Sequence, residues 1–167
     1  RKSKSTQIRA ALFSALMAVC SWISIPFGHI AFTLQTFGVL LALGVLEGRW
    51  GCACVGLYLL LGLMGLPVFS GFRGGASALI GPTGGFLWGF LAAALCYWAL
   101  QRLGRLPAMI GAQLVCYVCG CLWFAFYAGG GFGGTLLVCV APYLVSDAVK
   151  LALAHSVSGR LRRHLRL

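Results

Sequence analysis

The sequence predicts an all-α membrane protein, because its composition, its uncharged stretches and its prolines all point to this fold class. Hydrophobic residues make up 60% of the 167 residues and charged residues only 9%, whereas a soluble domain carries about 25% charged residues. Four stretches lack charge and are each long enough for one or two helical spans of about 20 residues: residues 10–46, 50–72, 74–101 and 106–146. We therefore expect a single integral membrane domain over residues 1–167.

Five prolines divide these stretches into six predicted transmembrane helices. Proline is tolerated in the first helical turn but breaks a helix interior, so each proline marks a boundary. The expected helices cover residues 7–25, 36–46, 50–66, 82–100, 107–127 and 142–158. Between them we expect loops at 26–35, 67–81 and 129–134, a short interfacial segment at 135–141, and polar turns at 47–49 and 101–106.

The basic residues predict the orientation of this bundle. Six helices bring both termini to one side, together with the basic tails at about 1–6 and 159–167. Every Lys and Arg falls on that side except Arg73 in an outer loop and Lys150 inside the last helix. Cytoplasmic loops carry an excess of Lys and Arg. We expect a multi-pass protein of the cell membrane with both termini in the cytoplasm. Because topology explains the net charge of +11, nucleic acid is not an expected partner.

One acidic and one basic residue, Asp147 and Lys150, lie inside the last apolar stretch. The chain has only two carboxylates, Glu47 and Asp147. A charge inside a membrane costs about 2.5–3.5 kcal/mol on insertion scales, and such residues usually face the bundle interior and mark a ligand or ion site. Three residues apart on a helix, the two side chains share a face. The spacing predicts a ligand site near the outer end of this helix, with a purely structural ion pair as the alternative.

Two outer loops are expected to cap that site. The first, residues 26–35, is apolar but carries His29, Thr33 and Gln35, and the second, residues 67–81, places several glycines around Arg73. Irregular backbone near membrane depth is tolerated where it is buried in protein or lines a cavity. We expect a compact bundle with these loops over a ligand pocket, although each loop taken alone is also compatible with an ordinary connection.

No catalytic, cofactor or metal site is predicted. The sequence Cys116-Tyr-Val-Cys119 has the spacing of a redox or zinc site, but no second such pair exists, and buried cysteine commonly serves as a small apolar residue. The sequence Gly81-Pro-Thr-Gly-Gly85 lacks the lysine and the spacing of a phosphate-binding loop. We expect the protein not to be an enzyme, so active transport would need a partner ATPase.

The first helix carries Ala11 and Ala15, a small-x-x-x-small pair that permits close helix packing in lipid. This pair fits either a partner protein or packing within the chain.

Several segments resemble one known family. Leu63-Met-Gly-Leu-Pro-Val-Phe69, Gly81-Pro-Thr-Gly-Gly-Phe-Leu-Trp-Gly-Phe90, the Asp147/Lys150 pair after Pro142, and Phe32-Thr-Leu-Gln35 are similar to the pattern of BioY, the biotin-specific S component of energy-coupling factor (ECF) transporters. The resemblance extends from about residue 10 to 154. Phe86 departs from it, because the family usually has Tyr there.

The resemblance implies a six-helix subunit that captures biotin from the outside. It also implies three partners besides biotin and membrane lipid: a transmembrane coupling protein and a pair of cytoplasmic ATPases. In this class the small residues of the first helix dock on the coupling protein, so Ala11 and Ala15 carry over as the partner-binding pair.

The resemblance implies that Asp147 and Lys150 form the ligand site, and the chemistry of biotin suggests the following contacts, with a solvated loop charge as the alternative for Arg73. Asp147 would accept a ureido N–H, and Lys150 would neutralise it and donate to a ligand oxygen. Tyr143 and Trp88 would form part of an apolar wall, and Arg73 would meet the carboxylate. The remaining polar candidates are Gln35 and Thr83.

Two other functions remain open. In a self-sufficient carrier or channel, Asp147 would relay protons, although no inverted repeat is visible. A structural scaffold would leave the charged pair without a ligand.

Overall fold

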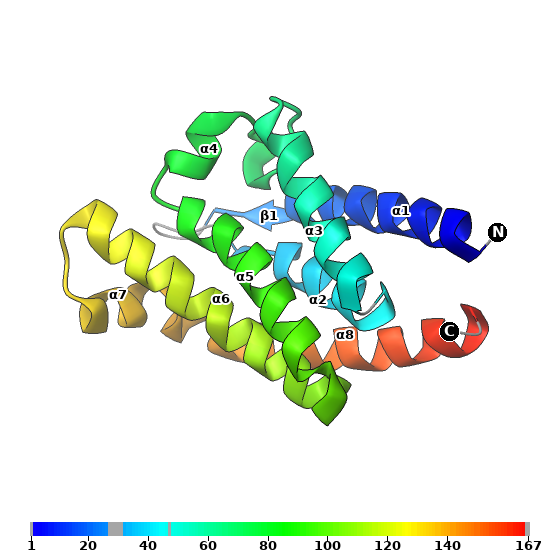
Figure 1. The fold of residues 1–167 in the computed structure, drawn as a ribbon. Coiled ribbons are helices and arrows are strands. Elements are labelled where there is room, and N and C mark those ends of the chain that lie inside the picture. Colours follow the sequence, from blue (N-terminus) through cyan, green and yellow to red (C-terminus); the bar gives the residue numbers. More distant parts are fainter. Residues whose placement is uncertain (1, 27–31, 47, 166–167) are drawn as a thin grey trace.

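Residues 2–26, 32–46 and 48–165 are described by the computed structural model, in which long helices lie side by side (Figure 1). A two-residue strand β1 (Ser24–Ile25) follows the first helix and pairs antiparallel with β2 (Phe32–Thr33). Short 3-10 turns cover Ser70–Phe72, Gln101–Leu103 and Ala141–Tyr143. The α-helices are α1 (Lys2–Trp22), α2 (Gln35–Leu46), α3 (Gly48–Leu63), α4 (Ala76–Ile80), α5 (Gly84–Leu100), α6 (Arg105–Ala128), α7 (Phe132–Cys139) and α8 (Leu144–Leu165).

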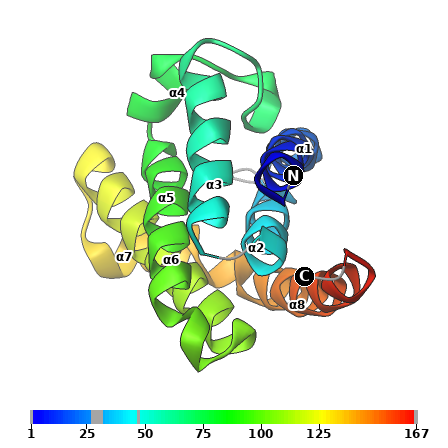
Figure 2. The same cartoon turned by 45° about the vertical axis from the view of Figure 1, so that its right-hand side comes forward.

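Helix α2 is the central element of the bundle. Residues 38–45 are all buried, and α2 packs against α1, α3 and α8 (Figure 2). These residues carry no polar side chain, so the helix has no face that needs water. At 1.5 Å per residue, the 12 residues of α2 span roughly 18 Å, less than the thickness of a bilayer core.

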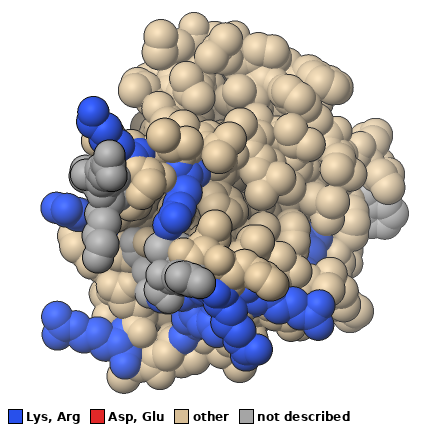
Figure 3. Space-filling view, turned by 90° about the vertical axis from the view of Figure 1, so that its right-hand side faces the viewer, with Lys and Arg blue, Asp and Glu red and all other residues tan. Residues whose placement is uncertain are grey.

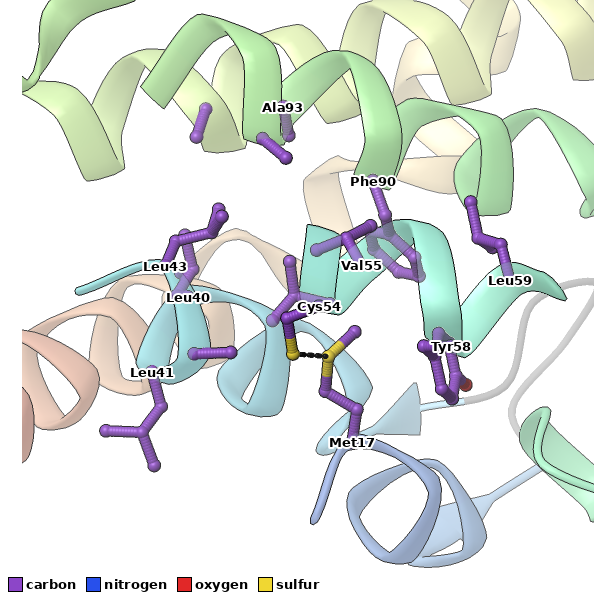
Figure 4. Packing of buried hydrophobic residues seen from close by; sticks show 14 of the residues in the cluster. Met17, Leu40, Leu41, Leu43, Cys54, Val55, Tyr58, Leu59, Phe90 and Ala93 are labelled. Atoms are coloured by element: carbon purple, nitrogen blue, oxygen red, sulfur yellow. Dashed lines mark hydrogen bonds between the residues drawn. The ribbon is translucent and has the colours of Figure 1, made fainter. Parts of the chain in front are cut away.

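The core fills the space between α2 and its neighbours. Leu40 and Leu43 of α2 point toward Val55 of α3 and toward α5 (Figure 4). On the other side, the Sγ atom of Cys54 lies 3.9 Å from the Sδ atom of Met17 on α1. The same Cys54 sulfur lies 3.4 Å from the Ser14 Oγ atom, so the Cys54 thiol fills the core and also has hydrogen-bond partners there.

Glycines bring α5 and α6 close together. A Cβ atom at Gly85 would overlap the Trp123 side chain, and one at Gly120 would overlap the Phe86 ring. The absence of a side chain at these two positions lets a large aromatic ring of the partner helix lie directly on the backbone. This contact fixes where Phe86 lies.

The prediction of an all-α membrane protein is confirmed in its main features. Within the described part of the chain, three segments are long and apolar enough to cross a membrane: Gly84–Leu103, Arg105–Ala128 and Phe132–Leu165. Helices α2 and α3 are apolar but shorter. Large apolar side chains such as Leu114, Leu122 and Leu153 face outward and are 52–56% exposed, as expected for contact with lipid.

Several predicted boundaries are wrong, chiefly where helices continue further than expected. Helix α1 begins at Lys2 and α8 runs to Leu165, so most of both predicted tails is helical. No proline interrupts α8, and the basic residues of its last turn interact favourably with the carboxyl end of a helix. The segment predicted at 135–141 is largely the helix α7, and the loop at 67–81 contains α4.

The start of α1 and the end of α8 lie at the same end of the bundle (Figure 1), which is compatible with the predicted even number of crossings. Lys and Arg side chains gather on the face that includes this end (Figure 3). The predicted clustering of basic residues beside the termini is therefore present in three dimensions.

Candidate ligand site

Asp147 and Lys150 form a buried ion pair on α8. The Lys150 Nζ atom lies 3.0 Å from the Asp147 Oδ1 atom, and the two residues are only 6% and 7% exposed. The i,i+3 spacing places both on one helical face, as the sequence predicts. Because a buried charge is strongly disfavoured unless it is paired, each side chain requires the other.

Two further segments hold this pair. The Tyr117 hydroxyl of α6 donates a hydrogen bond to the Asp147 Oδ2 atom. The Lys150 Nζ atom donates to the Thr33 carbonyl of β2 at 2.6 Å and lies 4.6 Å from the centre of the Phe32 ring. An ammonium group has three N–H donors, and the two named acceptors use two of them. Within the described part of the chain, one N–H of Lys150 therefore has no named acceptor and can donate to a ligand.

The ion pair lines a cavity to which most of the bundle contributes. Its polar wall comes from the start of α2, from α6 and from α8, and its apolar wall comes chiefly from α5. The loop after α3 and the end of α7 complete the lining. A largely apolar cavity with a few convergent polar groups is the usual form of a small-molecule site. The principal lining residues are Thr33, Gln35, Arg73, Thr83, Phe86, Phe90, Gln113, Tyr117, Tyr143, Asp147 and Lys150.

The predicted residues Gln35, Thr83 and Tyr143 all line this cavity. Gln35 is fixed in position because its Nε2 atom donates to the Tyr58 hydroxyl at 2.7 Å. The Tyr143 ring stacks on Phe32 with a centroid distance of 6.2 Å. The three residues belong to separate segments, which the fold brings to one place.

Arg73 lies at the exposed edge of the same cavity. Its Nε atom donates to the Ser70 carbonyl at 3.1 Å, and its backbone carbonyl accepts from the Phe69 amide at 3.0 Å. These bonds fold the loop back on itself and hold the guanidinium near the cavity. His29, in the first predicted cap loop, lies outside the described residues.

The structure places Trp88 away from the cavity. Its side chain is 46% exposed on the outer face of α5, and its Nε1 atom donates to the Leu79 carbonyl at 3.3 Å. Residues two apart on a helix point about 200° apart, so Trp88 faces away when Phe86 faces inward. Phe86 and Phe90 form the wall predicted for Trp88.

This fold and sequence match known proteins over nearly their whole length. A family model described as the BioY family matches residues 2–167. The chain belongs to the BioY family. It is 38% identical to the biotin transporter BioY of Thermotoga maritima, over 93% of this chain and 95% of the relative. It is 37% identical to a probable biotin transporter BioY of Pyrococcus horikoshii, over 96% of this chain and 98% of the relative.

A solved structure shares the fold of this BioY-family protein. The crystal structure of an S-component for biotin from an ECF-type ABC transporter superimposes with a TM-score of 0.90 at 26% identity. The match covers 97% of this chain and 93% of the other.

Sequence reasoning missed two polar residues of this BioY cavity, Gln113 and Tyr117. With Cys116 they occupy positions i, i+3 and i+4 of α6 and so share the face that lines the cavity. A signal was present, because Gln113 is the only Gln or Asn between residues 106 and 146. A single amide in such an apolar stretch indicates a buried polar site.

The predicted partner-binding pair lies on the outer face of α1. Ala11 and Ala15 are exposed, beside Ile8 and Leu12, which are 61% and 65% exposed. Intramolecular packing, the alternative interpretation of this pair, is not what the bundle shows. The two alanines instead form a flat part of an apolar surface.

The cysteines provide no metal site among the described residues, since no three potential ligands come together there. All eight thiols are free, and Cys116 lines the cavity while Cys119 is only half buried.

Proposed function

We propose that this BioY-family protein is the biotin-binding S component of an ECF transporter. The observation that carries the proposal is the buried Asp147–Lys150 pair, which lines a largely apolar cavity and has one N–H for which no acceptor is named among the described residues. Biotin as the substrate is supported by the relatives, which are named biotin transporters, and by the S-component for biotin that shares this fold.

The polar groups of the cavity match the head of biotin. A ureido ring offers two N–H donors and one carbonyl acceptor. Asp147 accepts one N–H through a lone pair that its two existing bonds leave unused, and Lys150 donates its remaining N–H to the carbonyl. Hydrogen bonds to ionised groups are shorter and stronger than neutral ones. Thr83 and Gln35, which line the same cavity, are further polar contacts.

The rest of the ligand follows the apolar wall to the mouth. Phe86, Phe90 and Tyr143 cover the thiophane ring and the valerate chain. Arg73 meets the carboxylate at the exposed edge, where an arginine can bind both oxygens at once. This arrangement places the charged end of biotin nearest to water and the uncharged ring system inside.

The bundle crosses the membrane six times, through α1, α2 together with the extended β2 segment that precedes it, α3, α5, α6 and α8, with both termini in the cytoplasm. The position of both termini at one end and the basic residues of that face support this topology. The cavity then opens to the outside, and its first ligand contact is Arg73.

Delivery inward depends on partners. A transmembrane coupling protein docks on the apolar face of α1 around Ala11 and Ala15, since small residues let two helices approach closely in lipid. A pair of cytoplasmic ATPases supplies the energy, because the chain carries no nucleotide-binding loop of its own.

Calorimetric titration of the detergent-purified protein with biotin tests this function. We expect one-to-one binding, and Asp147→Asn should weaken it by about 100-fold or more, because a charge-assisted bond is lost and Lys150 is left unpaired. Trp88→Phe, outside the cavity, is the matched control and should keep the affinity. Absence of binding by folded protein would refute the assignment of biotin, and unchanged affinity of Asp147→Asn would refute the site.

A further inference from the structure

Gln113 holds a buried hydrogen-bond acceptor that nothing in the described part of the chain satisfies. The residue lies on α6, is only 7% exposed and lines the cavity. Its Oε1 atom is buried and has no partner among the residues that the structure describes. An acceptor in this situation has given up its hydrogen bonds to water without a replacement, which is unfavourable.

The other polar groups of the cavity contrast with this one. Both Asp147 oxygens already accept a hydrogen bond, from Lys150 and from Tyr117. The Gln35 amide donates to Tyr58. The Gln113 oxygen is thus a buried acceptor at this site that gains a hydrogen bond when a donor arrives with a ligand.

The position of Gln113 relates it directly to the ion pair. Gln113 and Tyr117 are four residues apart on one face of α6, and the Tyr117 hydroxyl is bonded to Asp147. Two acceptors of different kinds, a carboxylate and an amide carbonyl, therefore line the same polar wall. A ligand with two separate N–H donors can use both, whereas a ligand with one donor leaves an acceptor unpaired.

We propose that Gln113 is a specificity-determining residue whose side-chain carbonyl accepts the second N–H of a cyclic urea. The inference rests on the proposed function, with Asp147 as acceptor of the first N–H. A site built to hydrogen-bond a ligand group rejects analogues that lack it far more strongly than an apolar pocket rejects a missing methylene. The site accordingly selects ligands that carry both ureido N–H groups.

The test compares three ligands by calorimetry in detergent: biotin and the two cyclic carbamates in which either ureido N–H is replaced by oxygen. The variants are the unchanged protein, Gln113→Met, which keeps the length of the side chain but lacks the acceptor, and Gln7→Met, a matched exchange at an exposed position of α1. Size-exclusion chromatography and thermal unfolding show whether each variant is folded.

The unchanged protein should prefer biotin over both carbamates. Gln113→Met should weaken biotin binding by about 10- to 100-fold and reduce the preference over one carbamate to less than about 3-fold, while the preference over the other persists. Gln7→Met should behave like the unchanged protein. This selective loss distinguishes a ligand contact from a general effect on packing.

Several outcomes would overturn the inference. Unchanged biotin affinity in Gln113→Met, or an equal loss for all three ligands, would each refute it while leaving biotin binding by the unchanged protein intact. If Gln113→Met does not fold, the test rests on the three affinities of the unchanged protein. Binding of either carbamate as tightly as biotin would then refute a need for two donors. Failure of the unchanged protein to bind biotin would overturn the proposed function as well.

Discussion

Replacing Lys150 by methionine would leave Asp147 as an unpaired carboxylate inside the bundle. The ion pair has a 3.0 Å contact between residues that are 6% and 7% exposed, so little water can take over the role of Lys150. Removing one partner of a buried pair costs about 3–5 kcal/mol. The variant also loses the 2.6 Å bond to Thr33 and the position over the Phe32 ring. We expect the free energy of unfolding to fall by about 4 kcal/mol or more.

A double-mutant cycle separates this effect from a loss of packing. The double variant Asp147→Asn/Lys150→Met carries no charge at the site, and replacing both partners of a buried pair is often close to neutral. It should therefore regain at least about 2 kcal/mol of the stability that Lys150→Met loses. The assay is reversible unfolding in a defined detergent, followed by tryptophan fluorescence, with Lys4→Met on the exposed face of α1 as control. If the effects of the two single changes add within about 0.5 kcal/mol, the pair is not coupled and the reasoning is refuted.

Three further predictions concern the remaining parts of the site and the partner surface. Tyr117→Phe removes the donor to Asp147 and should weaken biotin binding by about 10-fold in calorimetry, whereas an unchanged affinity would show that Tyr117 does not orient the carboxylate. Arg73→Gln should weaken binding of biotin several-fold but leave the affinity for biotin methyl ester unchanged, and an equal loss for both ligands would exclude a contact with the carboxylate. Ala11→Trp should prevent co-purification with the coupling protein but keep the affinity for biotin. The control Leu114→Trp, on the exposed face of α6, should co-purify normally. Normal co-purification of Ala11→Trp would show that this face of α1 is not the interface.

The sequence was sufficient to predict the helical membrane fold and the charged pair. Asp147 and Lys150 stand out because they interrupt a long uncharged stretch, and their i,i+3 spacing alone puts them together on a helix. The partners Tyr117 and Thr33 could not be found in the same way. They lie 30 and 117 residues away from the side chains that they contact, so only the packing of α6 and β2 against α8 brings them to the pair.

The position of Trp88 outside the cavity has a local cause that helix geometry explains. Phe86 and Phe90 are one turn apart and line the cavity, so Trp88 between them must face the other way. A large aromatic side chain in this segment suggests a ligand wall, but the periodicity of α5 excludes Trp88 once Phe86 is placed inward.

The length of α8 is underestimated for a different reason. Basic residues near a helix end suggest a solvated tail, although they favour the helix there.

The arrangement of bonds around the pair also limits what each residue can add to affinity. Asp147 and Lys150 already satisfy much of their hydrogen-bonding capacity with each other, Tyr117 and Thr33, so the site is stable before a ligand enters. A ligand gains less from a carboxylate that is already bonded than from an acceptor that has no partner. The pair therefore mainly fixes the position and polarity of the site, and a large part of the selectivity for two N–H donors falls to Gln113, whose oxygen lacks a partner among the described residues. On this reasoning the loss at Asp147 has a large component from the unpaired Lys150, which is why Asp147→Asn should lower stability as well as affinity, whereas Gln113→Met should lower affinity alone.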